Sequence, residues 1–211
     1  MNKLNIVIID YGVGNTHSVI NALKSLDYKV KISSDAKTIK DSDVLVLPGV
    51  GAFETVMNNL RSRGLEDLLN EEVVQNNKPI LGICAGMQMM ASTSEENGIH
   101  KGLNWIKGNV LKLQLPEQFS VPHVGWNTIS IKKKDVLFSK LEDECHFYFD
   151  HSYHFVPDDP SHVAAACNYG IDVAAAVQDR HILGVQFHPE KSQTNGLKLF
   201  RSFFNNVMQY A

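Results

Sequence analysis

The chain has 211 residues, of which 44% are hydrophobic and 20% charged; this suffices for the core of one domain over residues 1–211 but leaves no room for a second catalytic domain. Its formal net charge of −3 excludes the basic surface with which proteins bind nucleic acid or an anionic membrane. The apolar run after Lys3 ends at Asp10, too early for a signal peptide or a membrane span, so we expect a cytoplasmic protein.

Hydrophobic periodicity in the first half of the chain predicts alternating strands and helices. Strands are expected over residues 4–9, 28–32, 44–47 and 79–83, and helices over residues 15–26, 52–63, 65–75 and 85–91. Strands that alternate with helices pair in parallel, because each helix carries the chain back across a face of the sheet. The sequence therefore predicts an α/β fold with a central, mostly parallel sheet and helices on both faces.

Short β-rich runs replace this alternation after Trp105. They cover residues 109–113, 128–131, 147–149, 163–167 and 173–178, and their close spacing favours antiparallel pairing. A last apolar strand is expected over residues 182–187, and residues 196–208 carry apolar side chains at helical spacing. We therefore expect a smaller antiparallel β extension beside the parallel sheet, followed by a C-terminal helix.

A GxCxG sequence, Gly82-Ile83-Cys84-Ala85-Gly86, stands between a predicted strand and a predicted helix, as a nucleophile elbow does. In such a turn the glycines let the helix pack close beneath a strained central residue, which is raised toward a cleft. A thiol at a helix N-terminus is stabilised as the thiolate by unpaired N–H groups and the helix dipole. The motif alone also allows a buried cysteine that packs as a small hydrophobe.

Backbone N–H groups close to this turn are candidates for an oxyanion hole. The residue after an elbow nucleophile donates its N–H to the oxyanion, which indicates Ala85. A second donor is expected from Gly49, Val50 or Gly51, at the end of the strand predicted over residues 44–47.

A general base and a carboxylate that orients it follow the last predicted strand, as His188 and Glu190. In an extended segment residues two apart point to the same side, and Pro189 between them stiffens the backbone, so the two side chains can hydrogen-bond. Parallel sheets gather functional groups at the carboxyl ends of their strands. Cys84, His188 and Glu190 therefore match a catalytic triad of nucleophile, base and orienting group.

Neither a metal nor a cofactor is expected. The three cysteines, Cys84, Cys145 and Cys167, include no CxxC pair, which argues against a disulfide framework and a zinc cage. His151 and His154 lie three residues apart, a spacing that in one strand points side chains to opposite faces.

Three motifs resemble those of the class I glutamine amidotransferases: GICAGMQ (residues 82–88), PGVGAF (48–53) and QFHPEKS (186–192). The resemblance spans nearly the whole chain. The resemblance implies a flavodoxin-like fold and a glutaminase. In that family the cysteine attacks the side-chain amide of glutamine, the histidine protonates the departing ammonia, and water releases glutamate from a thioester.

Further motifs resemble the glutaminase subunits of imidazole glycerol phosphate synthases, which act in histidine biosynthesis: IDYGVGN (residues 9–15), PHVGWN (122–127) and HSY (151–153). This resemblance implies that ammonia passes to a separate (β/α)8 cyclase subunit, the partner in a heterodimer. It places L-glutamine against Gln88, Glu96 and the backbone of Ser152 and Tyr153. It places four residues at the subunit interface: Asn15, Trp126, Tyr148 and Lys191.

Two residues depart from the family pattern. Ala85 stands where leucine is usual, which matters little because the expected oxyanion donor is backbone. Asp150 stands where an apolar residue is usual, and a carboxylate there can change which partner docks. A sibling amidotransferase that aminates a surface-polysaccharide sugar is therefore an alternative. A cysteine hydrolase or peptidase and a catalytically inactive scaffold are two others.

Overall fold

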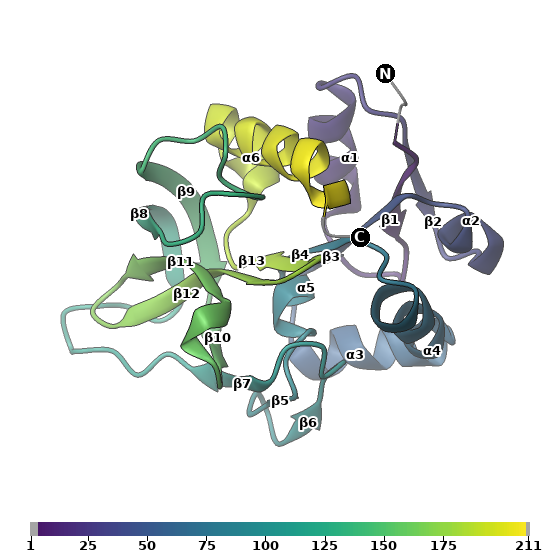
Figure 1. Ribbon diagram of the computed structural model, residues 1–211. Helices are drawn as coiled ribbons and strands as arrows, with labels where there is room; N and C mark the ends of the chain where they lie inside the picture. Colours follow the sequence, from purple (N-terminus) through teal and green to yellow (C-terminus); the bar gives the residue numbers. More distant parts are fainter. Residues whose placement is uncertain (1–3, 210–211) are drawn as a thin grey trace.

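The computed structural model describes residues 4–209 (Figure 1). Its parallel half consists of strands in the spatial order β2-β1-β3-β4-β13, and all neighbours among them are parallel. This is the flavodoxin-like order 2-1-3-4-5 when β13 is counted as the fifth strand. The strands are β1 (Ile6–Ile9), β2 (Val30–Ser33), β3 (Val44–Gly49), β4 (Ile80–Cys84) and β13 (Ile182–Val185).

Helices cover both faces of the parallel strands, as predicted (Figure 1). Each face of the sheet carries its own hydrophobic core. Side chains alternate along β1, so that Ile6 and Ile8 pack into the core on one face and Val7 and Ile9 into the core on the other. The first core lies under α1 (Thr16–Lys24) and α6 (Gln193–Asn206). The second lies under α2 (Ala36–Lys40), α3 (Phe53–Ser62), α4 (Leu65–Leu69) and α5 (Ala85–Gln88).

The antiparallel extension continues the same sheet beyond β13. Its strands follow in the order β12 (Asp172–Asp179), β11 (Val163–Asn168), β8 (His123–Ile131) and β9 (Glu144–His151). A separate small sheet packs below, in the order β10 (Tyr153–Pro157), β7 (Gly108–Lys112), β5 (Thr93–Ser94) and β6 (His100–Lys101). The chain crosses from one sheet to the other at Ser152, between β9 and β10.

Several predicted elements have different bounds in the structure. The helix expected over residues 65–75 is α4 followed by a π-helical segment, Asn70–Gln75, and the helix expected over residues 85–91 ends at Gln88. The short helix α2 was not predicted, although Asp35 caps it by accepting a hydrogen bond from the Thr38 N–H at 2.8 Å. Within residues 4–209, no helix is long and apolar enough to cross a bilayer.

Candidate active site

Cys84 lies on a strained turn where β4 ends and α5 begins. Its backbone angles are φ 54° and ψ −115°, a left-handed conformation that a residue with a side chain rarely adopts. A Cβ atom on Gly86 would overlap the carbonyl oxygen of Leu47 on β3, and one on Gly82 would lie 2.7 Å from the Gly86 carbonyl oxygen. Glycine at both positions therefore allows α5 to pack against β3 and β4.

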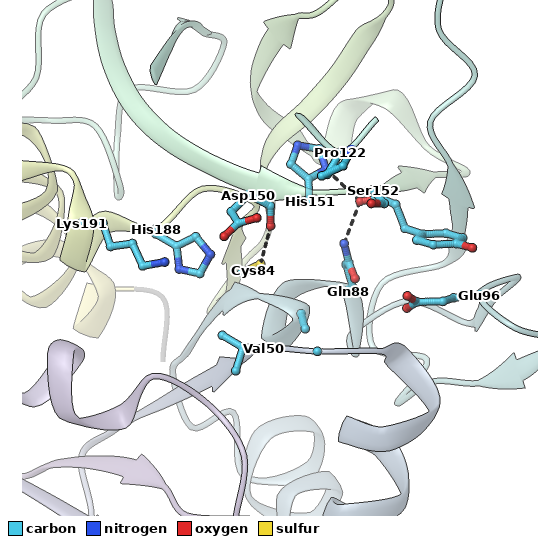
Figure 2. Close-up of a pocket in the computed structure, with 13 residues that line it drawn as sticks. Val50, Cys84, Gln88, Glu96, Pro122, Asp150, His151, Ser152, His188 and Lys191 are labelled. Carbon is cyan, nitrogen blue, oxygen red and sulfur yellow. Dashed lines mark hydrogen bonds between the residues drawn. The ribbon is translucent and has the colours of Figure 1, made fainter. Parts of the chain in front are cut away.

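The thiol opens on a cavity of about 300 Å³ at the carboxyl ends of β3 and β4 (Figure 2). Such a volume suits a ligand the size of an amino acid. Most of the residues predicted for catalysis and glutamine binding line it: Val50, Gly51, Cys84, Ala85, Gln88, Glu96, Ser152, Tyr153 and His188. Pro122, Asp150, His151 and Lys191 complete the lining.

The loop after β13 brings His188 to the thiol. The His188 N–H donates to the carbonyl oxygen of Tyr148 on β9 at 2.8 Å, and the Ser192 hydroxyl donates to the His188 carbonyl oxygen at 2.6 Å. Figure 2 shows the imidazole beside Cys84, on the side of the cavity that Lys191 also occupies. His188 is buried, so its orientation is set by protein contacts and not by solvent.

Glu190 holds the far side of the imidazole, because its Oε1 lies 2.8 Å from His188 Nδ1. The prediction that residues 188–190 are extended is wrong: Pro189–Lys191 forms a 3₁₀ turn. Proline favours the first position of such a turn, and the turn still lets the two side chains meet. Glu190 Oε1 also accepts a hydrogen bond from Asn15 Nδ2 at 3.0 Å. Asn15, predicted at the partner interface, therefore also supports the carboxylate.

The surroundings of His188 favour its protonated form. Burial alone would lower its pKa, but hydrogen bonds to Cys84 and Glu190 and the negative charges of these groups raise the pKa to about 10. A cationic imidazole beside a thiolate is the arrangement by which cysteine enzymes keep the sulfur nucleophilic and hold a proton ready for the leaving group.

This raised pKa predicts a loss of folding stability at alkaline pH. Because the folded pKa of about 10 lies above the ordinary 6.5, the contribution is fully present below pH 6.5 and is lost as the pH rises through about 10. The free energy of unfolding in urea, measured across this range, should fall more steeply for the wild type than for His188→Asn. If the free energies of unfolding of the two proteins fell equally with pH, the raised pKa of His188 would be wrong.

The segment between β3 and α3 faces the thiol from the opposite side. Val50 and Gly51 line the cavity, and Figure 2 shows Val50 across Cys84 from Asp150. Gly49 does not line the cavity: it pairs with Cys84 across β3 and β4, and a Cβ there would lie 2.5 Å from the Gly86 nitrogen. It packs against the elbow instead.

Contacts on both sides anchor this segment. The Tyr11 hydroxyl donates to the Pro48 carbonyl oxygen at 2.6 Å, and the Phe53 N–H donates to Glu96 Oε2 at 2.7 Å. Between the anchors, Val50 is 40% exposed and Gly51 has a φ of 98°. The stretch that would supply the second oxyanion donor is therefore fixed at its ends and open to solvent at its middle.

Gln88 and Glu96 approach the cavity from the side away from His188 (Figure 2). Gln88 Nε2 donates to the Tyr153 carbonyl oxygen at 2.9 Å and to Gln186 Oε1 at 3.0 Å. Both amide protons of Gln88 are thus used inside the protein, and its oxygen lies on the side of Glu96. Two acceptor groups at one end of a cavity suit a ligand ammonium.

Gln186 is a residue of the site that sequence reasoning missed. Its side chain is fully buried, and its Nε2 lies 3.8 Å from Cys84 Sγ, within hydrogen-bonding reach of sulfur. The sequence does contain a sign of it: Gln186 is a polar residue inside an apolar run, two residues before His188, and a polar side chain buried in such a run needs a hydrogen-bond partner.

Trp126, Tyr148 and Lys191 lie together, and Lys191 also lines the cavity. The Trp126 and Tyr148 rings pack edge to face with centroids 6.2 Å apart, and Lys191 Nζ lies 5.4 Å from the Tyr148 ring centroid. Trp126 is 50% exposed, so it lies on the surface as predicted. Asp150 on β9 is also exposed, and it lies opposite the exposed Val124 on β8, two register positions from the Trp126–Tyr148 pair.

The family described as "Glutamine amidotransferase class-I" matches residues 7–207 of this chain. "Imidazole glycerol phosphate synthase subunit HisH 2" of Vibrio vulnificus is 47% identical, over 97% of this chain and 95% of that protein. "Imidazole glycerol phosphate synthase subunit HisH" of Pelagibacter ubique is 42% identical, over 96% of this chain and 100% of that protein. These similarities span both halves of the sheet.

Solved structures show the same fold. One titled "Crystal structure of glutamine amidotransferase" has a TM-score of 0.74 at 22% identity, over 94% of this chain and 97% of that one. "Structure of PurLQS from Thermotoga maritima" has a TM-score of 0.74 at 16% identity, over 96% of this chain and 98% of that one. The matched residues and the relatives together place the chain among the class I glutamine amidotransferases, in the group of HisH subunits.

Proposed function

We propose that this chain is the glutaminase subunit of an imidazole glycerol phosphate synthase: it hydrolyses L-glutamine and passes the ammonia to a (β/α)8 cyclase in histidine biosynthesis. The observation that carries the proposal is a cavity with Cys84 and His188 at one end and Gln88 and Glu96 at the other, with Glu190 behind His188 and hydrogen-bonded to it. The Glu190 carboxylate, the His188 imidazole and the Cys84 sulfur form a triad. The side-chain oxygens of Gln88 and Glu96 favour a ligand with an ammonium group, such as an amino acid. All three cysteines are free thiols, which suits a reducing cytoplasm.

The catalytic cycle has two steps. Cys84 Sγ attacks the side-chain carbonyl carbon of glutamine, and the negative oxygen that forms is stabilised by the N–H groups of Ala85 and of the segment at Val50 and Gly51. The C–N bond then breaks, His188 gives its proton to the nitrogen, and ammonia leaves a glutamyl thioester. Neutral His188 then takes a proton from a water molecule, the water oxygen attacks the thioester carbon, and the C–S bond breaks; glutamate leaves, and the Cys84 thiolate and the cationic His188 are restored.

Recognition of glutamine rests on its α-carbon end. Its ammonium is placed between the oxygens of Gln88 and Glu96, and its α-carboxylate against the backbone N–H groups of Ser152 and Tyr153. A peptide bond at either group would remove the charge that these contacts recognise. A peptidase is therefore the weaker interpretation of the same elbow.

The cyclase is proposed to dock over the rim of the cavity. Large apolar side chains are exposed in these segments: Val50 in the cavity lining, Val121 next to Pro122 of the lining, and Val124 and Trp126 on β8. An apolar patch with aromatic and cationic neighbours is typical of the centre of an interface. Asp150 can change which cyclase docks, because burying its carboxylate requires a cationic group on the partner. The alternative function is therefore to supply ammonia to a sibling enzyme that aminates a surface-polysaccharide sugar.

Glutamine hydrolysis with and without partner tests this function. The isolated chain is expected to hydrolyse glutamine slowly, and the cyclase of the same organism should raise the rate by about 100- to 1,000-fold, the typical effect of one oxyanion donor. The complex should then form imidazole glycerol phosphate from glutamine. Rapid hydrolysis by the chain alone would contradict partner activation. Activation only by a different cyclase would assign the chain to the alternative acceptor.

A further inference from the structure

A row of buried histidines lies behind the end of the cavity assigned to the α-carbon end of glutamine. His123 on β8 and His151 at the end of β9 are 2% and 6% exposed, and His123 Nδ1 lies 3.0 Å from His151 Nε2. His151 Nδ1 lies 2.9 Å from the carbonyl oxygen of Tyr153. His154, expected to share a strand with His151, belongs instead to β10. The catalytic cycle described above uses none of these rings.

Both rings are neutral at neutral pH. Burial lowers the pKa of His123 to about 4. Burial also lowers the pKa of His151 to about 3, although its hydrogen bond to the Tyr153 carbonyl opposes the change. A neutral imidazole has one N–H and one acceptor nitrogen, so each ring can donate on one side only.

The end groups set the direction of every bond in this row. A carbonyl oxygen only accepts, so His151 Nδ1 carries the proton, its Nε2 accepts, and His123 Nδ1 must donate. His123 Nε2 is then an acceptor, and Asn127 Nδ2 lies 3.4 Å from it. The orientation of the Asn127 amide is fixed by its Oδ1, which accepts from the Thr128 N–H at 2.8 Å.

Packing holds the first ring rigidly. His123 is stacked between Tyr169, with ring centroids 3.9 Å apart and planes at 18°, and Phe149, with centroids 4.7 Å apart and planes at 19°. A ring clamped in this way cannot turn to exchange its two nitrogens without moving both neighbours. The tautomer of His123 is therefore built into the fold.

The row ends on the atom that holds Gln88. The Tyr153 carbonyl oxygen accepts from His151 Nδ1 and from Gln88 Nε2, whose second proton goes to Gln186 Oε1. Gln186 Nε2 in turn reaches Cys84 Sγ. The histidine row is thus joined through one carbonyl to the substrate pocket and through two amides to the nucleophile.

We propose that His123 and His151 are positioning residues for glutamine binding: a neutral chain of fixed direction, Asn127 to His123 to His151 to the Tyr153 carbonyl, holds the backbone at Tyr153 and the side chain of Gln88 in their binding positions. This rests on the proposed function, because the ligand held there is glutamine. His151 does not act as an acid or base and does not touch the reacting amide. Its Nδ1 proton serves the backbone.

Imidazole NMR of the ¹⁵N-labelled chain tests the chain of bonds without any assay of activity. Both His123 and His151 should show the Nδ1–H tautomer at neutral pH. An Nε2–H tautomer or a protonated ring at either position overturns the proposal. This result does not depend on glutamine being the substrate, so it separates a failure of the proposal from a failure of the proposed function.

Matched substitutions test the consequence for binding. Glutamine affinity is measured by calorimetry in a Cys84→Ala background, which cannot turn glutamine over. His123→Leu should weaken binding about fivefold, the equivalent of about 1 kcal/mol for one buried hydrogen bond. His123→Asn should bind like the parent, because its Nδ2 can take the place of the imidazole Nδ1 donor. Equal affinities for the leucine variant and the parent, or equal weakening by both substitutions, overturns the proposal. No binding by the parent itself would instead count against the proposed function.

Discussion

Replacing Cys84 with alanine is expected to abolish glutamine-dependent synthesis by the complex while synthesis from added ammonia continues at the wild-type rate. Only the thioester step uses the sulfur, and ammonia supplied from solution bypasses that step. The loss should be at least about 10⁴-fold in kcat, as for other enzymes that lose a nucleophile. Product formation from glutamine and from ammonium salts, measured on the same preparation, provides the comparison.

Cys145 offers a matched control for this substitution. It is buried, it does not line the cavity, and burial together with the charge of Glu142 raises its pKa to about 11. Cys145→Ala should therefore cost some packing energy and leave both activities in place. Iodoacetamide should label Cys84 before Cys145. If Cys84→Ala also eliminated ammonia-dependent synthesis, its role would be structural and the triad assignment would fail.

The sequence was sufficient for the part of the site that is local in the chain. The elbow was predicted from two glycines around Cys84. The contact between His188 and Glu190 was predicted from their place after an apolar strand, although it is made through a 3₁₀ turn and not through the extended segment expected. Parallel pairing of β3, β4 and β13 then brings these segments to one edge of the sheet, since their register aligns Gly49 with Cys84 and Val185 with Ile83. A local motif and the strand alternation together specify this geometry.

The remaining contacts join positions too distant for any spacing rule. Asn15 reaches Glu190 across 175 residues, and Gln186 reaches Cys84 across 102 residues. His123 meets His151 because β8 pairs with β9 in a register that sets these residues opposite each other. An antiparallel register depends on loop lengths and on the match of two strand faces, which a single sequence does not reveal. The supporting groups of the site therefore required the three-dimensional structure.

Gly86→Ala is expected to lower the free energy of unfolding by more than about 3 kcal/mol and to eliminate glutamine hydrolysis. The new methyl group would overlap the Leu47 carbonyl oxygen and would lie 3.4 Å from the Gly49 nitrogen. Both neighbours are backbone atoms of β3, so neither can rotate away as a flexible side chain would. Relief requires β3 and α5 to separate, and β3 leads directly into the segment at Val50 and Gly51.

The same substitution at Gly64 isolates this steric effect from the general cost of replacing glycine. Gly64 has a φ of +67°, and a Cβ atom added there would meet no other atom within 4 Å, so Gly64→Ala should cost only the backbone strain of about 1 to 2 kcal/mol. Urea unfolding and glutamine hydrolysis with the cyclase present should be measured for both variants. Wild-type stability of Gly86→Ala would show that the elbow is not packed as tightly as described. Retained hydrolysis in a destabilised Gly86→Ala protein would separate the packing of the elbow from the placement of the oxyanion segment.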